Sequence, residues 1–212
     1  LIDNDETLMD FKKAQEFAST SMYKKSQLSQ QRPFSDNLLA SYQNCNHSWW
    51  KKLELGECNK TELQTGRFRD FLTENDLIAD PDEINSSYMY ELGEGRFLLD
   101  DVLDILEYLH GRYKVYITTN GVAETQRRRI NGSPIANHVD GVFVSEETGF
   151  AKPDKRYFDF VKNHLGCRDP SDFIVIGDSL SSDILGAKNA GMDSIWFNPH
   201  HISNPEKIPF SY

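Results

Sequence analysis

From about residue 96 to residue 212, the chain alternates short apolar runs with amphipathic segments of helical period. Strands are predicted at 115–118, 142–144, 173–176 and 194–197. Helices are predicted at 98–109, 124–130, 155–165 and 182–190. Such alternation indicates an α/β fold with a parallel sheet covered on both faces. Leu1 and Ile2 read as the tail of a further strand, and a complete sheet would need more of that strand ahead of residue 1.

The stretch from residue 11 to residue 95 carries helical spacing and lacks a strand pattern. Asn59 and Glu62 have the spacing of a capping box, and Pro81 is expected to begin another helix. A polar loop rich in Ser and Gln ends at Pro33. We therefore predict a helical cap domain of about four helices at 11–95, inserted into a core domain formed by 1–10 and 96–212.

Polar side chains follow the predicted strands or precede the next helix. Because the carboxyl ends of parallel strands meet at one edge of the sheet, where ligands bind, these side chains are expected to converge. Two carboxylates, a hydroxyl, an amine and a second acidic pair would meet there. The residues are Asp3, Asp5, Thr119, Asn120, Lys152, Asp178 and Asp183.

Each segment also has a purely structural interpretation. Thr119-Asn120-Gly121 fits a simple turn, and Asp178 fits a turn with a helix cap. Lys152 could be a surface lysine, and Asp183 could lie in the first turn of a helix. The expected convergence of the four segments at one edge of the sheet favours a catalytic site, because a bound cation and a fixed geometry make a carboxylate competent to attack phosphorus.

Composition and charge indicate which classes of partner the protein is expected to bind. The net charge is −10 and the isoelectric point is about 5.0, which disfavours binding to nucleic acid. The sequence contains no apolar run long enough to span a membrane. Cys45, Cys58 and Cys167 are widely separated, so we expect free thiols in the cytoplasm and neither a zinc site nor a catalytic thiol.

The four polar segments resemble the four motifs of the haloacid dehalogenase superfamily of aspartate-nucleophile hydrolases. The resemblance implies a Rossmann-like three-layer core with a helical-bundle cap. A narrower similarity, to the pyrimidine 5′-nucleotidase branch, implies a small phosphate ester as substrate, a nucleoside monophosphate, and a monomer or homodimer. It rests on stretches 8–11, 93–95, 119–121, 145–149 and 196–199.

The resemblance implies a role for each matching residue. Asp3 would be the nucleophile, and Asp5 the general acid and base. Thr119 and the backbone N–H of Asn120 would bind the phosphoryl group, and Lys152 would neutralise charge. Asp3, Asp178 and the backbone carbonyl of Asp5 would ligate Mg²⁺, which prefers hard oxygen ligands, and Asp183 would support the metal through water or through Lys152.

Two residues depart from the family pattern, because Asn4 replaces a usually apolar residue and Glu6 a usual Asn or Gly. Asp5 itself favours phosphoryl transfer, since the dehalogenase branch lacks it and needs no metal. Alternatives within the fold are a sugar-phosphate or phosphoglycolate phosphatase, a phosphomutase, or a haloacid dehalogenase. A binding module without catalysis is an alternative of another class.

Substrate choice is expected to depend on the helical insertion. An aromatic side chain there could stack on a base, and an amide or imidazole could read its polar edge. The two tryptophans also suit the helical core, and a lone histidine is more often structural. His200 and His201 are expected in a loop after the last strand. The candidates in the insertion are Asn44, His47, Trp49, Trp50 and Arg67.

Overall fold

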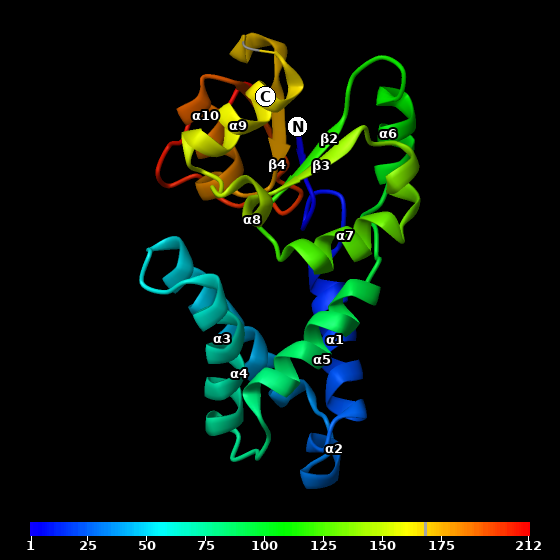
Figure 1. The fold of residues 1–212 in the computed structure, drawn as a ribbon, viewed down its shortest axis with the longest axis vertical. Helices are drawn as coiled ribbons and strands as arrows, with labels where there is room; N and C mark the ends of the chain where they lie inside the picture. Colours follow the sequence, from blue (N-terminus) through cyan, green and yellow to red (C-terminus); the bar gives the residue numbers. More distant parts are fainter. Residues whose placement is uncertain (168) are drawn as a thin grey trace. The chain divides into compact units, whose positions relative to one another are not determined.

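The computed structural model describes residues 1–167 and 169–212, which form two compact units (Figure 1). One unit combines Leu1–Lys12 with Arg96–Tyr212 and contains the sheet. The other, Lys13–Gly95, is built from helices. In the described part of the chain, no helix is long and apolar enough to cross a membrane.

The sheet of the first unit contains five parallel strands among the described residues, in the order β3-β2-β1-β4-β5. Their bounds are β1 Ile2–Asp3, β2 Tyr116–Thr119, β3 Gly141–Val144, β4 Ile174–Gly177 and β5 Asp193–Trp196. The strand order reverses at β1, because β2 and β3 lie on one side of it and β4 and β5 on the other. Asp3 ends β1 and therefore lies at the switch point, where open α/β sheets bind their ligands.

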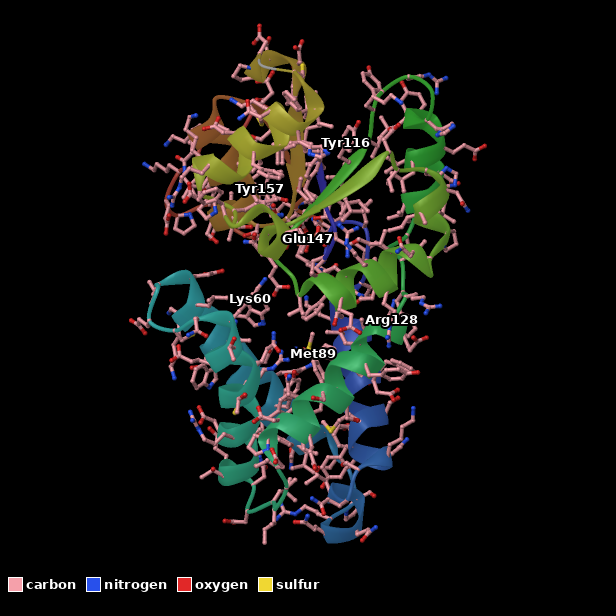
Figure 2. The ribbon with its side chains drawn as sticks, in the orientation of Figure 1. Lys60, Met89, Tyr116, Arg128, Glu147 and Tyr157 are labelled. Carbon is pink, nitrogen blue, oxygen red and sulfur yellow. The ribbon has the colours of Figure 1, made fainter. Side chains whose placement is uncertain are left out.

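Helices cover both faces of this sheet, which confirms the predicted three-layer α/β fold. Neighbouring strand residues point to opposite faces, so Val175 joins one apolar cluster and Ile176 packs against the other. On one face pack α9 (Lys155–Leu165) and α10 (Leu185–Ala190), and Tyr157 of α9 donates a hydrogen bond of 2.8 Å to the Phe143 carbonyl (Figure 2). On the other face pack α6 (Val102–Leu109) and α7 (Ala123–Asn131).

One predicted helix of this unit is shorter than expected, and another begins in a different helical form. The segment before α6 is extended instead, because Leu98 forms an antiparallel bridge with Met9, and the N–H of Leu99 donates to the Leu8 carbonyl at 3.1 Å. Asp101 then adopts a left-handed conformation with φ of 61° just before α6. The predicted helix 182–190 begins as a π-helical turn, Leu180–Ile184, before α10.

The five strands include four that were predicted in this unit, and these agree with the predicted bounds to within a residue at each end. Short elements connect the remaining parts of the unit. The connecting elements are η1 Pro134–Asn137, α8 Ser145–Thr148 and η2 Pro170–Asp172.

The second unit contains four long helices and one short one. Their bounds are α1 Phe11–Lys25, α2 Leu28–Gln31, α3 Asp36–Glu54, α4 Lys60–Glu74 and α5 Pro81–Glu94. The predicted polar loop is wrong at α2, since Leu28 is fully buried and anchors a helical turn there. The capping box of Asn59 and Glu62 is present, and Pro81 begins α5 as predicted.

Aromatic rings fill the interior of the helical unit. Tyr42 stacks on Phe68 with ring centroids 5.0 Å apart, and its ring also meets Tyr88 at 5.0 Å. Trp49 lies against Gly66 so closely that a Cβ on that glycine would fall 2.2 Å from the indole ring. The indole N–H of Trp49 also donates to Asp70 at 2.8 Å. Trp49 is therefore a packing residue of this unit.

Candidate active site

Lys152 is the centre of a buried cluster of charges in the sheet unit. Its Nζ lies 2.5 Å from Oδ1 of Asp3 and 2.6 Å from Oδ1 of Asp183, and it donates to the Thr118 carbonyl at 3.0 Å. The Lys152 and Asp183 side chains are each 1% exposed. Three acceptors thus surround the ammonium, so its direction is fixed and it faces the end of β1.

The loop that carries Lys152 is tied to the loop that follows β2. The Asn120 side chain accepts from the backbone N–H of Lys152 at 2.9 Å and donates to its carbonyl at 2.8 Å. Thr119, almost fully buried at the end of β2, accepts from the N–H of Gly121 at 3.0 Å. The side chain of Asn120, and not only its backbone, therefore positions the candidate site.

Three carboxylates lie close enough to share one cation. Asp3, Asp178 and Asp183 each offer an oxygen, and these oxygens lie within 4.8 Å of one another. The Asp178 carboxylate accepts from the Thr7 hydroxyl at 3.3 Å, and its backbone carbonyl accepts from the Trp196 indole at 2.9 Å. The second oxygen of Asp183 accepts from the N–H of Ser179 at 3.2 Å.

The electrostatics of this cluster favour a bound divalent cation. Burial raises the pKa of Asp3 well above its usual value, with Lys152 opposing the rise. Burial and then the charge of Asp183 raise the pKa of Asp178 from 3.8 to about 6. Burial alone would lower the pKa of Lys152, but Asp183 and Asp3 raise it. The cluster contains three carboxylates, and Lys152 contacts two of them, Asp3 and Asp183. The hard oxygen donors therefore fit Mg²⁺, which would offset the excess negative charge.

Gly177 is the reason that Asp183 can reach this cluster. A Cβ on Gly177 would fall 2.3 Å from Oδ2 of Asp183, so a side chain at the end of β4 would displace that carboxylate. The π-helical turn brings Asp183 back toward β4, because its N–H and that of Ile184 both donate to the Ser179 carbonyl. A glycine at the strand end is thus a requirement of the acidic cluster.

Asp5 lies outside the cluster of three carboxylates. Its side chain is 27% exposed and forms an ion pair with Arg129, whose side chain is fully buried. Gln126 donates to the other oxygen of Asp5 at 2.7 Å. Sequence reasoning missed both residues of α7, because only the structure shows that Thr125, Gln126 and Arg129 form a buried polar face.

The two departures from the family pattern have visible consequences. Asn4 is fully buried, and its amide donates to Gln126 at 2.5 Å. Glu6 has a φ of 61°, the left-handed conformation that Asn and Gly adopt with least strain. Its carboxylate accepts from the N–H of Lys12 at 2.9 Å, at the start of α1. The loop therefore keeps a tight turn despite both replacements.

The other candidate residues belong to the helical unit, except His200 and His201. Arg67 is buried in the helical unit, where its guanidinium donates to Asn46 and Asn85, each at 2.9 Å. Asn44, His47, His200 and His201 are exposed, and Trp50 is half-buried. Cys45, Cys58 and Cys167 are free, as predicted.

A cavity of about 780 Å³ opens at the opposite, amino ends of the strands. Apolar side chains such as Tyr116 and Phe173 line it beside Leu1. Among the described residues, its lining includes none of the predicted site residues, so the cavity is separate from the acidic cluster.

The chain is similar in sequence and in fold to known hydrolases. The sequence profile of a family described as haloacid dehalogenase-like hydrolase matches residues 1–191. The HAD-hydrolase YfnB of Bacillus subtilis is 35% identical over 99% of this chain and 88% of its own length. Its magnesium-bound crystal structure gives a TM-score of 0.90 at 33% identity, over 99% of this chain and 90% of that one.

Two similar proteins are named as pyrimidine 5′-nucleotidases. PynA of Streptococcus pneumoniae is 32% identical over 100% of this chain and 88% of its own length. YjjG of Escherichia coli is 33% identical over 79% of this chain and 73% of its own length.

Proposed function

Because the chain belongs to the haloacid dehalogenase-like hydrolase family, we propose that it is a Mg²⁺-dependent phosphatase of small phosphate monoesters. Within that class, we propose that it is a 5′-nucleotidase acting on pyrimidine nucleoside monophosphates. The observation that carries the phosphatase proposal is the contact of Lys152 with Asp3 and Asp183 at the end of the switch strand. The nucleotide part is supported by the names of PynA and YjjG.

In the proposed reaction, a carboxylate oxygen of Asp3 attacks phosphorus, and the bond between phosphorus and the nucleoside oxygen breaks. Asp5 donates its proton to that oxygen, so that the nucleoside leaves as an alcohol. Asp5 then accepts a proton from the water molecule that attacks the phosphoaspartate, which releases phosphate and regenerates Asp3. Two steps suit a phosphate ester, because direct attack by water on such esters is extremely slow.

Other residues hold the reacting groups in place. Lys152 neutralises charge on Asp3 and on the phosphoryl group, and the hydroxyl of Thr119 with the N–H of Asn120 bonds to phosphoryl oxygens. Because these groups are fixed before the substrate arrives, they need no reorganisation during the reaction. The loop contacts of Asn120 set the position of Lys152.

The residues proposed to hold Mg²⁺ are the side chains of Asp3 and Asp178 and the backbone carbonyl of Asp5. When bound, the cation supplies positive charge that stabilises the phosphoryl oxygens in the transition state. Asp183 supports this site through Lys152, which it contacts at 2.6 Å.

Phosphate release from a panel of esters tests the proposal. The panel contains dUMP, dTMP, UMP, purine monophosphates, sugar phosphates and phosphoglycolate, each with Mg²⁺ and with EDTA. We expect metal-dependent release, fastest with a pyrimidine monophosphate, and a loss of more than about 10³-fold in Asp3→Asn. A sugar phosphate as best substrate would keep the phosphatase and reject the nucleotidase. Full activity of Asp3→Asn would reject the mechanism, and an isomeric phosphate as product would indicate a mutase.

A further inference from the structure

The side chain of Asp5 is held by α7 and is not one of the three carboxylates of the acidic cluster. Arg129 forms an ion pair with one oxygen, and Gln126 donates to the other at 2.7 Å. The two residues are three positions apart on α7, so they project from the same face of the helix. Both oxygens of this carboxylate are therefore bound by donors from a single helix.

A short chain of hydrogen bonds determines the orientation of the Gln126 amide. The Asn4 amide nitrogen donates to Oε1 of Gln126 at 2.5 Å, so Oε1 is the acceptor end of that side chain. Its Nε2 then points to Asp5. Asn4, one of the two residues that depart from the family pattern, thus orients the Gln126 amide toward Asp5.

Arg129 supplies the charge in this arrangement. Its side chain is fully buried, and a buried guanidinium is stable only with an anionic partner. The Asp5 carboxylate is an anionic partner of Arg129. The guanidinium also lies 5.9 Å from the centroid of the Phe11 ring at the start of α1. The position of Arg129 is thus set by packing as well as by charge.

We propose that Arg129 and Gln126 are positioning residues that hold the Asp5 carboxylate away from Asp3, Asp178 and Asp183. The inference rests on the proposed function, in which the Asp5 side chain transfers protons and only its backbone carbonyl binds the cation. A carboxylate two residues from Asp3 is itself a suitable ligand for a divalent cation. Coordination would remove it from proton transfer, and the two donors of α7 compete with that coordination.

Gly121 makes the Gln126 contact possible. A Cβ at this position would fall 2.3 Å from Nε2 of Gln126 and 2.6 Å from its Cγ. Gly121→Ala would therefore displace the amide from Asp5 while leaving Asp5 and Arg129 unchanged. This variant keeps the test independent of whether the buried Arg129 tolerates substitution.

The test compares two substrates that differ in their need for a proton. The alkoxide leaving group of dUMP must be protonated, whereas p-nitrophenolate leaves without help. We expect Arg129→Met to lower kcat/KM for dUMP roughly 10²-fold and kcat/KM for p-nitrophenyl phosphate less than about threefold, because kcat/KM covers the steps up to departure of the leaving group and not the later hydrolysis of the phosphoaspartate. Gly121→Ala should show the same split at about tenfold, and Arg129→Lys should recover part of the loss.

Arg127→Met is the matched control on the same helix. Arg127 forms a surface pair with Glu147 of α8, with an Nη2 to Oε2 distance of 2.5 Å. We expect kcat for both substrates to change less than about twofold, since exposed ion pairs contribute little. Asp5→Asn is the reference for complete loss of the proton-transfer group, and adding Arg129→Met to it should cause little further loss for dUMP.

Calorimetric titration with Mg²⁺ provides a readout that does not depend on turnover. Arg129→Met should bind Mg²⁺ at least as tightly as the unaltered protein, because Asp5 becomes free to join the cluster. Equal losses with both substrates, or weaker binding of Mg²⁺ by a folded variant, would overturn the inference. Failure of the unaltered protein to hydrolyse either substrate would instead reject the proposed function, and the inference with it.

Discussion

Replacing Asp178 by asparagine should stabilise the metal-free protein at neutral pH, although it removes a proposed metal ligand. Asp178, Asp3 and Asp183 place their oxygens within 4.8 Å of one another. Without a cation, burial and the charge of Asp183 make the ionised form of Asp178 unfavourable. Asparagine keeps an oxygen that can accept from the Thr7 hydroxyl, as Asp178 does, but it carries no charge.

The magnitude follows from the pKa of Asp178, which burial raises from 3.8 to about 6. The folded protein holds this proton more tightly than the unfolded chain does, so stability is lost as pH rises from 3.8 through about 6. The difference corresponds to about 3 kcal/mol at most, and solvent screening of this half-buried group reduces it to about 1–3 kcal/mol. Near pH 4, the effect of this raised pKa on the free energy of unfolding should be close to zero.

The assay is urea denaturation followed by circular dichroism, in EDTA, at pH 4 and at pH 7. The free energy of unfolding of Asp178→Asn should exceed that of the unaltered protein by about 1–3 kcal/mol at pH 7, with the gap closing toward pH 4. Added Mg²⁺ should stabilise the unaltered protein more than the variant. A variant that is less stable than the unaltered protein at pH 7, or a gap that does not change with pH, would refute the reasoning.

Three further predictions concern close contacts. Gly66→Ala, which normally stabilises a helix, should lower the free energy of unfolding by about 1–3 kcal/mol, because its methyl group would overlap a buried indole ring; a gain measured by urea denaturation would contradict this packing. Gly177→Ala should displace Asp183 and lower kcat roughly tenfold or more, without loss of secondary structure by circular dichroism. Asn120→Ala should lower kcat about 10–100-fold, because it removes both contacts that position Lys152; unchanged turnover would reject that role.

The layered α/β fold was predictable because each strand and helix carries its own hydrophobic period. The errors come from contacts that are distant in sequence. Leu98 pairs with Met9, and this pairing shortens α6. Leu28 forms a helical turn only because the surrounding helices bury it. The spacing of apolar residues along the chain indicates neither the bridge of Leu98 with Met9 nor the burial of Leu28.

The convergence of Asp3, Lys152 and Asp183 was predictable from the common edge of a parallel sheet, whereas the partners of Asp5 were not. Three consecutive arginines occupy positions 127–129. The three side chains are identical, so only the packing of α7 determines that Arg129 is the one that is buried. The Asn120 side-chain contacts were missed for a similar reason, since the Asn-Gly pair alone indicates a turn.

The backbone pairing beside β1 makes the helical insertion exchangeable. The chain leaves the sheet unit after Lys12 and returns at Arg96, and close to these points Met9 and Leu98 are bridged to each other. The N–H of Asp10 also donates to the Phe97 carbonyl at 3.0 Å, so the exit and the return form a two-stranded stem. The entropic cost of closing such a stem depends only weakly on the length of the chain between its ends. A shorter turn or a foreign helical bundle could therefore be grafted at this stem while the sheet, Asp3 and Lys152 keep their places.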